Sequence, residues 1–314
     1  MDVRQGEGDR RIGPFTVLGT LPQLSDHDLS GGAFGCVFSA RADDGTEAVL
    51  KLCRPHGGSV GNTVGVGFHR PAVGYERGDD GGPARHVTLG LDAVAAVLRS
   101  DAVLLQREGG VLLPAFRGIF EYAPSASSGP LPALAMEHVR GRRPETADDV
   151  VRVLESLAAA AESGRLDFHG DLKPEHVFLD DARLAVRLVD PAPRLMGDAR
   201  AFTPEYNPYG LTGPASDVFA LAVILYEVIA RVSPFVFEGR PDAPFAGSAP
   251  RGDGVEALAL PPPVARGRPR PTGRAGPPCD SMTTFVDEIL ATDPREHPAW
   301  ASNHRSALQR LLGT

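Results

Sequence analysis

Lysine is nearly absent from this sequence of 314 residues: of its 32 basic residues only two are lysines, Lys51 and Lys173, and the rest are arginines. Asparagine is also scarce, with three residues, whereas alanine, glycine, proline and arginine are abundant. This is the profile of a GC-rich genome, in which arginine replaces lysine wherever either side chain serves. The two lysines are therefore expected where a compact ammonium is required and a planar guanidinium does not fit.

Cysteine and long apolar runs are also lacking. The three cysteines, Cys36, Cys53 and Cys279, form no CxxC pair, which argues against a cysteine-rich zinc site and favours a reduced, cytoplasmic protein. The longest apolar run, residues 218–230, is interrupted by Glu227 and is too short to span a bilayer, so it predicts a buried helix. The polar N-terminus shows no secretory signal.

The basic residues form no cluster, and the net charge is −8. Nucleic acids and anionic membranes both require a basic face on their partner, so neither is expected to bind here. The apolar content of 42% allows a substantial core, and the length suits one large two-lobed domain or two ordinary ones.

Strand patterns dominate the first part of the chain. Residues 34–52 alternate around a turn at Asp43–Gly45, which predicts a β-hairpin. Apolar residues at helical spacing predict a helix over 91–107, and residues 116–122 and 134–139 predict a pair of short strands.

The second part is predicted to be mainly helical. Thr146 followed by Asp149 offers a capping box, and Ser216 is a suitable cap for a later helix. The expected elements are, in chain order, an apolar helical stripe from Val150 to Ala158, β-like segments at 176–179 and 184–189, a helix over 217–231 and a last helical region over about 281–312.

Three segments lack these patterns. Residues 1–25 are a polar extension with one possible strand, Phe15–Leu18. Residues 54–85 are dense in glycine and predict a long inserted loop, and residues 238–279, rich in proline and glycine, predict a second loop.

The most informative segment is 169–179, HGDLKPEHVFL, which is followed by Leu188-Val189-Asp190. It resembles the catalytic loop and metal-binding aspartate of protein kinases, and other motifs of that family occur in the right order over roughly residues 28–300. The sequence therefore resembles a divergent member of the eukaryotic-like (bacterial) Ser/Thr protein kinases.

This resemblance implies an α+β, two-lobed fold, with a small antiparallel β N-lobe that carries one main helix and a larger, mostly helical C-lobe. The implied boundaries are an N-terminal extension 1–25, an N-lobe 26–139 with the insertion 54–85, and a C-lobe 140–314 with the loop 238–279.

The resemblance also implies an ATP site. A glycine-rich loop, in which Ser30 replaces the family's first glycine, would let backbone N–H groups approach the phosphates. Val37 and Val49 would enclose the adenine ring. Met136 would be the gatekeeper, and backbone groups of the hinge would meet the adenine edge. The implied nucleotide-binding residues are Ser30, Gly31, Gly32, Ala33, Phe34, Gly35, Val37, Val49, Lys51, Asp101, Met136, Glu137 and Val139.

Lys51, in the strand sequence AVLK, resembles the lysine that grips the α- and β-phosphates. If two lysines fell at random among the 32 basic positions, both would occupy the family's two lysine positions in roughly one case in 500. The partner of Lys51 on the following helix is expected to be Asp101, with Glu108 and Glu76 as alternatives. Because aspartate is one methylene shorter than the usual glutamate, the helix would have to lie closer.

Phosphoryl transfer requires held phosphates, a held metal and an aimed acceptor hydroxyl. Asp171 resembles the catalytic base, and Lys173 would neutralise the γ-phosphate. Thr203 either lies beside these two residues, the alignment that we favour, or begins the segment that replaces the family's Ala-Pro-Glu. Asp217 resembles the buried helix aspartate that anchors the catalytic loop in protein kinases rather than in small-molecule kinases.

The metal site departs from the family pattern. Asp190 would bind Mg²⁺, but it stands in Asp-Pro-Ala rather than Asp-Phe-Gly, which predicts a stiffer segment. His176 occupies the position of the asparagine that is the second Mg²⁺ ligand. Mg²⁺ prefers oxygen, whereas imidazole suits Mn²⁺ or Zn²⁺ better. Four alternatives follow. Asp190 binds the metal without a second protein ligand, or the preferred metal is a softer ion than Mg²⁺. Otherwise phosphoryl transfer is weak, or His176 packs in the core without binding a metal.

Regulation by phosphorylation of the activation loop is not expected. Gly170 replaces the arginine that normally binds the phosphate, and residues 191–202 contain no Ser, Thr or Tyr. The chain is therefore expected to be constitutively competent or controlled by a regulatory partner.

Three functions remain open. The leading hypothesis is an ATP-dependent kinase that phosphorylates Ser/Thr of a protein substrate with Mg²⁺, with Mn²⁺ as the alternative metal. The alternative is a pseudokinase that binds nucleotide or a partner. A small-molecule phosphotransferase of the aminoglycoside type is suggested by His-Gly-Asp and opposed by Lys173 and the helix of Asp217.

Overall fold

The computed structural model describes both the strand-rich and the helical part of the chain. The described residues are 11–20, 35–53, 73–76, 85–88, 91–123, 129–192, 199–200, 203, 205–207, 209–237, 263–265, 280–292 and 296–314.

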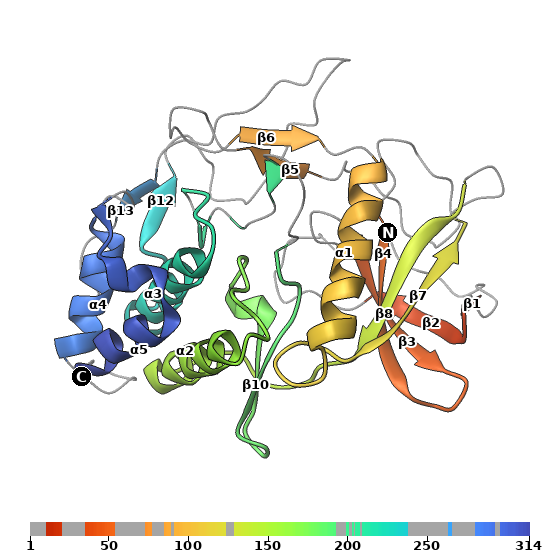
Figure 1. Ribbon diagram of the computed structural model, residues 1–314, viewed down its shortest axis with the longest axis horizontal. Helices are drawn as coiled ribbons and strands as arrows, with labels where there is room; N and C mark the ends of the chain where they lie inside the picture. Colours follow the sequence, from red (N-terminus) through yellow and green to blue (C-terminus); the bar gives the residue numbers. More distant parts are fainter. Residues whose placement is uncertain are drawn as a thin grey trace.

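An antiparallel sheet with helix α1 (Leu91–Glu108) on one face forms one side of the molecule (Figure 1). Within the described residues, the strand order is β1-β2-β3-β4-β8-β7. Helix α1 packs on β4, β7 and β8. The strands are β1 (Arg11–Ile12), β2 (Phe15–Thr20), β3 (Gly35–Ala42), β4 (Glu47–Cys53), β7 (Phe116–Tyr122) and β8 (Leu131–Glu137).

Side chains alternate between the two faces of this sheet. Phe38, Leu50 and Leu52 are buried on the face away from α1, where they form an apolar cluster with Ile12 and Phe15. Burying side chains of this size contributes about 1.5–3 kcal/mol each. The cluster leaves the other face of the same strands free to line the site described below.

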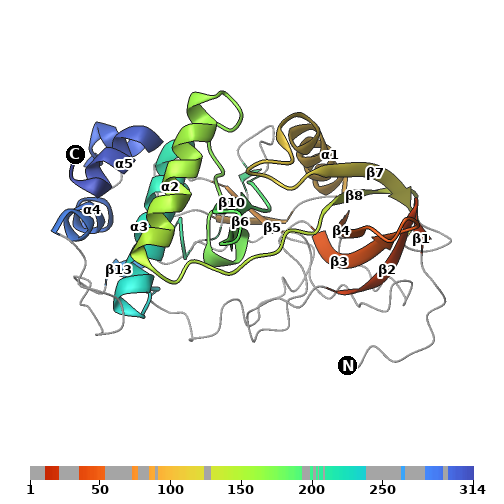
Figure 2. The ribbon, with the colours of Figure 1, turned by 90° about the horizontal axis from the view of Figure 1, so that it is seen from below.

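Helices form the other side of the molecule, and Figure 2 shows a short hairpin between the two sides. The hairpin strands are β9 (Val177–Asp180) and β10 (Ala185–Leu188), preceded by the 3₁₀ turn η1 (Pro174–His176). The helices are α2 (Ala147–Glu162), α3 (Pro214–Ala230), α4 (Asp280–Leu290), η3 (Ala299–Ser302) and α5 (His304–Leu312).

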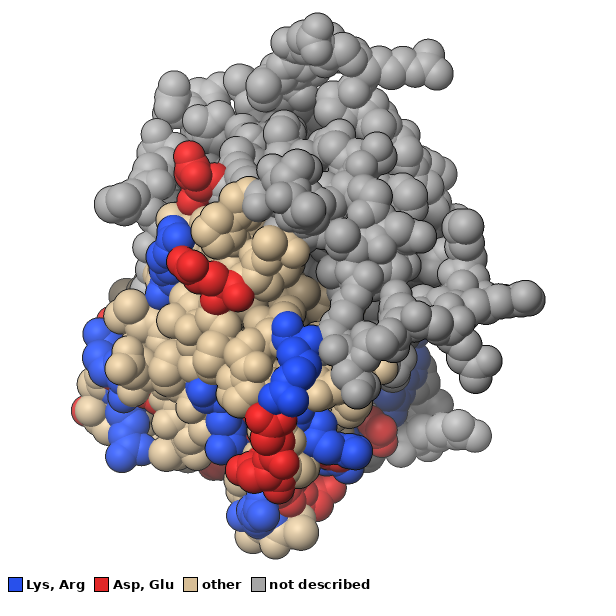
Figure 3. Space-filling model, turned by 90° about the vertical axis from the view of Figure 1, so that its right-hand side faces the viewer, with Lys and Arg blue, Asp and Glu red and all other residues tan. Residues whose placement is uncertain are grey.

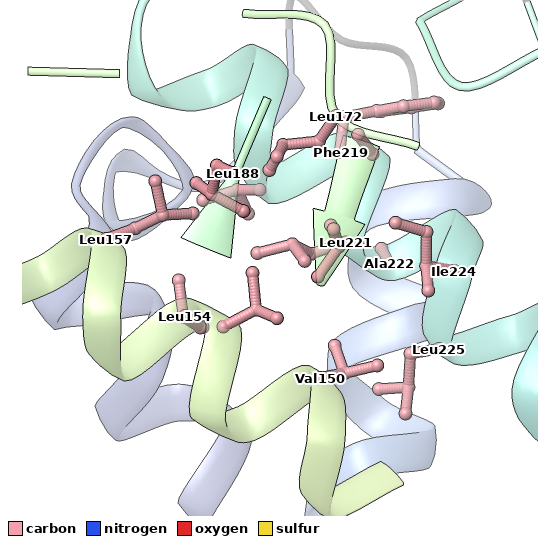
Figure 4. Packing of buried hydrophobic residues seen from close by; sticks show 14 of the residues in the cluster. Val150, Leu154, Leu157, Leu172, Leu188, Phe219, Leu221, Ala222, Ile224 and Leu225 are labelled. Atoms are coloured by element: carbon pink, nitrogen blue, oxygen red, sulfur yellow. The ribbon is translucent and has the colours of Figure 1, made fainter. Parts of the chain in front are cut away.

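Helices α2 and α3 build the larger core. Val150, Leu154 and Leu157 of α2 belong to one apolar cluster with Leu221 and Leu225 of α3, and Figure 4 shows Val150 beside Leu225 and Leu157 beside Leu188. The spacing of the α2 residues places them on one face, as the apolar stripe predicts. Helix α3 is apolar on all sides and almost wholly buried, which confirms the buried helix predicted from the apolar run.

Two small sheets involve segments that the sequence predicted as loops. Strand β5 (Val73–Glu76) lies within the insertion 54–85, and pairs with β6 (Arg85–Thr88) and with β11 (Ala199–Arg200). Strand β13 (Pro263–Ala265) lies within 238–279 and pairs with β12 (Phe235–Phe237). Such short strands depend on distant partners, which local composition does not reveal.

Two boundaries differ from the prediction. The predicted strand Phe15–Leu18 lies within β2, and the sheet extends further to β1, because Ile12 as well as Phe15 supplies a buried side chain. Helix α3 is capped by Gly213 rather than Ser216, which lies inside the helix and donates its hydroxyl to the Gly213 carbonyl at 2.7 Å. Pro214, favoured at a first helical position, sets this earlier start.

Acidic and basic side chains are interspersed over the described part of the sheet side of the molecule (Figure 3). No basic patch is visible on that part of the surface. Among the described residues, no helix has both the length and the apolar character needed to cross a bilayer.

The start of α2 is fixed by a buried carboxylate. Asp149, whose side chain is 3% exposed, accepts the N–H groups of Glu145 at 2.9 Å and Thr146 at 3.0 Å. Arg142 adds two guanidinium bonds of 2.7 Å to the same carboxylate. The Thr146 hydroxyl completes the predicted capping box. Although burial opposes its ionisation, these bonds lower the pKa of Asp149 well below its ordinary value.

Asp149→Ala should lower the free energy of unfolding by about 3 kcal/mol, because it leaves the N–H groups of Glu145 and Thr146 without their acceptor and removes two of the bonds of Arg142, which keeps Asp181 as a partner. Thr146→Ala removes one capping bond and should cost about 1 kcal/mol. Urea unfolding followed by circular dichroism compares the two. Equal losses would show that the capping bond, not the carboxylate network, dominates.

Candidate active site

The ammonium of Lys51 joins the sheet to α1 and to the helical side. Its Nζ lies 2.9 Å from Asp101 Oδ2 on α1 and also contacts Asp190 Oδ1 just after β10. The side chains of Lys51 and Asp101 are each 7% exposed. Of the three acidic residues considered as the partner, Glu108 instead accepts from Arg107, and the side chain of Glu76 lies outside the described residues.

These contacts keep Lys51 and Asp190 charged, whereas burial raises the pKa of Asp101 in spite of its contact with Lys51. Burial alone would lower the pKa of Lys51, but the carboxylates of Asp101 and Asp190 outweigh it, and the pKa rises above its ordinary value. Burial likewise opposes ionisation of Asp190, yet Lys51 lowers its pKa below the usual range. Asp190 has a positive φ of 55°, a conformation that aspartate adopts more readily than most residues.

The sheet face that carries Lys51 also carries the predicted adenine-enclosing side chains. Val37 lies directly opposite Lys51, and Val49 precedes Lys51 by two residues on the same strand. Met136 lies opposite Val49 on β8. Because directly opposed residues share a face, these four side chains line one surface.

The predicted hinge follows β8. The N–H of Glu137 donates to the Ala115 carbonyl at 2.9 Å. The Glu137 side chain contacts Arg187 of β10, which ties the hinge to the helical side. Val139 is buried after the strand.

The glycine-rich loop is largely beyond the described residues. Ser30, Gly31, Gly32, Ala33 and Phe34 lie outside them. Gly35 begins β3 opposite Cys53.

The second lysine lies beside the predicted base. Lys173 Nζ is 4.0 Å from Asp171 Oδ2 and donates to the Thr203 hydroxyl at 3.1 Å. The Thr203 N–H donates to Asp171 Oδ1 at 2.7 Å. Thr203 thus takes the place that the favoured alignment predicts. Burial opposes the ionisation of Asp171, but Lys173 and the hydrogen bond from Thr203 overcome it and lower the pKa of Asp171.

The backbone of the predicted catalytic loop is anchored on α3. The N–H groups of His169 and Gly170 each donate to the carboxylate of Asp217 at 2.7 Å, as the sequence predicts. His169 Nε2 lies 3.0 Å from the carbonyl of Val189, next to Asp190. Burial lowers the pKa of His169, which keeps the ring neutral and lets Nε2–H donate to that carbonyl.

His176 lies between the two aspartates. Its Nδ1 is 2.8 Å from the Asp171 carbonyl, and its Nε2 is 3.7 Å from Asp190 Oδ2. Burial, aided by Lys173, lowers the pKa of His176 to about 3, so the ring is neutral. A neutral ring that donates from Nδ1 carries its lone pair on Nε2, facing Asp190.

This donor pair fits a divalent cation. Lys51 contacts Oδ1 of Asp190, which leaves Oδ2 facing the Nε2 lone pair. Metal-bound histidines usually donate their other N–H to a carbonyl or carboxylate, as His176 does. Within the described part of the chain, no group of three or more His, Cys, Asp or Glu side chains could hold a metal ion. The remaining ligands would therefore come from phosphates or water.

Glu227 of α3 is influenced by two further carboxylates, those of Glu175 and Glu205. The hydroxyl of Tyr206 is 3.0 Å from Glu227 Oε2. Burial raises the pKa of Glu227 to about 7; the Tyr206 hydroxyl opposes this shift, and the carboxylates of Glu175 and Glu205 add to it. The glutamate of α3 is thus a proton-binding group in the folded protein near neutral pH.

Two residues, Arg187 and His304, make contacts that were not predicted from the sequence. Arg187 reaches Glu137 and the Leu113 carbonyl, and His304 reaches Asp217 at 3.1 Å. Both join residues far apart in the chain, and neither residue lies in a recognisable motif. No short-range signal could have indicated either contact.

No protein-family model matches the chain. Among solved structures, the PknI kinase domain of Mycobacterium tuberculosis matches with a TM-score of 0.51 and 14% identity, covering 98% of this chain and 99% of that domain. A mutant of the same domain gives a TM-score of 0.52 and 15% identity, covering 99% of this chain and 100% of that domain.

A Rad53 fragment (1–466) in complex with AMP-PNP matches with a TM-score of 0.48 and 16% identity. The match covers 95% of this chain, which spans 64% of the Rad53 chain. The likeness to the PknI domain shows that this chain has a protein-kinase-like α+β fold.

Glu227→Gln should change the dependence of stability on pH. Between its ordinary pKa of 4.5 and its folded value of about 7, the folded protein binds a proton that the unfolded chain releases, so stability falls as pH rises through this range. Glu227→Gln should reduce that fall by about 1–3 kcal/mol. Urea unfolding at pH 4.5, 6 and 7.5 measures how the free energy of unfolding of each protein changes with pH.

Glu155→Gln, an exposed glutamate of α2, controls for the loss of one negative charge. An identical pH profile in the Glu227 variant and the wild type would contradict the raised pKa.

Proposed function

We propose that this chain is an ATP-dependent protein kinase that transfers the γ-phosphate to Ser or Thr of a protein substrate. The observation that carries the proposal is a continuous set of contacts between the two lysines. Lys51 contacts Asp190, whose other oxygen faces His176. His176 bonds the backbone of Asp171, whose carboxylate lies beside Lys173.

The chemistry follows from these positions. Lys51 would hold the α- and β-phosphates, because its ammonium is fixed in direction by two carboxylates and remains protonated. Asp171 Oδ2 would accept the proton of the acceptor hydroxyl. The hydroxyl oxygen of the acceptor would then bond to the γ-phosphorus, while the bond between this phosphorus and the ADP oxygen breaks. Lys173 would offset the negative charge on the transferred group.

Asp190 and His176 would hold the divalent cation, which when bound supplies positive charge to the phosphates. Imidazole favours borderline ions such as Mn²⁺ over Mg²⁺. We therefore propose ATP with Mg²⁺ or Mn²⁺ as the cosubstrate.

A protein acceptor is favoured over a small molecule by two features. The Asp217 anchor on α3 is observed, and Lys173 is held on the Thr203 hydroxyl. After Asp190, β11 (Ala199–Arg200) pairs with β5 in the absence of a phosphate. This pairing supports a kinase that does not require activation-loop phosphorylation.

A second candidate is a nucleotide-binding regulator without transfer activity. His176 favours it, since a neutral imidazole replaces the amide oxygen expected for Mg²⁺. In that case the two lysines would bind nucleotide, and the protein would act through a partner.

Phosphatase-treated protein should transfer labelled γ-phosphate to generic protein substrates with Mg²⁺ or Mn²⁺. Lys51→Arg should lower this transfer at least about a hundredfold while the protein stays folded, because a guanidinium cannot occupy the buried site between two carboxylates. Arg107→Lys, an exposed exchange on α1, is the matched control.

ATP binding without transfer under either metal would establish the regulator instead. Transfer to aminoglycosides but not to proteins would establish a small-molecule phosphotransferase. Full activity in the Lys51 variant would remove the main support for the proposal.

His176→Asn should shift metal preference toward Mg²⁺. The amide oxygen is a hard ligand, so Mg²⁺-dependent transfer should rise about tenfold relative to Mn²⁺-dependent transfer. Initial rates over a range of each metal measure the ratio. An unchanged ratio would show that His176 only packs between the aspartates.

A further inference from the structure

His304, the first residue of α5, reaches the aspartate that anchors the catalytic loop. Its Nε2 lies 3.1 Å from Asp217 Oδ2, and the two side chains are 1% and 0% exposed. The residues are 87 positions apart. The contact therefore connects the C-terminal helix directly to α3 at the point where the catalytic loop is held.

Asp217 needs every donor that it receives. A buried carboxylate is costly unless it is paired and hydrogen-bonded. Within the described residues its donors are the N–H groups of His169 and Gly170 and the Nε2 of His304. Because a carboxylate accepts, Nε2 carries the proton in this contact. His304 thus shares Oδ2 with the His169 N–H.

Helix α5 holds His304 firmly. Asn303 caps the helix by accepting the Ser306 N–H at 2.9 Å. Ala307, Leu308 and Leu311 are buried in the larger core, where α5 packs on α2 and α4. The histidine is therefore presented from a rigid element rather than from a loop.

The residues on the other side of Asp217 have little room to move. Gly170 has a φ of +89°, and a Cβ there would lie 2.8 Å from the Cβ of Ala192. The next residue is Asp171. His169 bonds the Val189 carbonyl, which precedes Asp190. A shift of the Asp217 carboxylate would reach both aspartates of the proposed site.

We propose that His304 is a positioning residue that fixes the Asp217 carboxylate and, through it, the catalytic loop. The expected effect on phosphoryl transfer rests on the proposed kinase function, whereas the expected effect on the position of Asp217 and of the loop that it holds does not. The C-terminal helix is thus part of the catalytic framework and not only a cover for the core.

Two variants that carry the same amide group at different distances from the backbone test whether His304 positions Asp217. In His304→Gln the terminal NH₂ lies about as far along the side chain as Nε2, and in His304→Asn it lies one methylene short. Leu308→Ala, a truncation at another buried position of the same helix, controls for general loss of stability.

The first readout is exchange of the His169 and Gly170 amide hydrogens, measured by NMR. These amides should exchange about tenfold faster in the Asn variant than in the Gln variant, after correction for global stability with Leu308→Ala. The second readout is the steady-state transfer rate. We expect kcat to fall about tenfold in the Asn variant with little change in KM for ATP, and to recover largely in the Gln variant.

Equal exchange in the Asn and Gln variants, or faster exchange only to the extent seen in Leu308→Ala, would overturn the proposal. If the wild type transfers no phosphate, the proposed function fails, and the exchange measurement still decides the role of His304. If transfer is present and both variants keep the wild-type kcat, the positioning role fails while the proposed function stands.

Discussion

The structure depends on a buried ammonium held between two carboxylates. Lys51 extends from the sheet, Asp101 from α1 and Asp190 from the helical side. A buried ion group is tolerated only when its partners are close and well oriented. The three elements must therefore keep one relative arrangement for this contact to exist, and that arrangement also places the apolar face of β3, β4 and β8 over the site. The interaction that would orient nucleotide phosphates is the same one that positions the sheet side against the helical side.

Much of this arrangement could be predicted because its signals are local. The apolar run around Leu221 and Leu225 predicted a buried helix, and Thr146 with Asp149 predicted a helix start. The scarcity of lysine singled out Lys51 before any partner was known. The shorter reach of aspartate did not prevent the choice of Asp101, because its position on the helix, rather than its length, determines which carboxylate faces the strand.

The parts that could not be predicted are those decided by distant partners. Strand β5 forms against β11, more than a hundred residues later in the chain, and its glycine-rich surroundings resemble a loop. Ile12 looks like part of a polar extension until the sheet buries it. His304 has no neighbouring motif, and its role follows only from α5 folding back onto α3. In each case the local pattern is compatible with several structures, and long-range packing selects one of them.

His176 departs from the kinase pattern that the sequence resembles, but its ring still has a hydrogen-bond partner. The Asp171 carbonyl receives its Nδ1 proton, and burial keeps the ring neutral, so the substitution does not leave a buried polar atom stranded on that side. The lone pair on Nε2 is directed by that bond toward Asp190. A residue that merely filled a lost metal site would need no such orientation, since an apolar side chain would fill the space at lower cost. The orientation of this ring, rather than its mere presence, is therefore the feature that supports the proposed metal site.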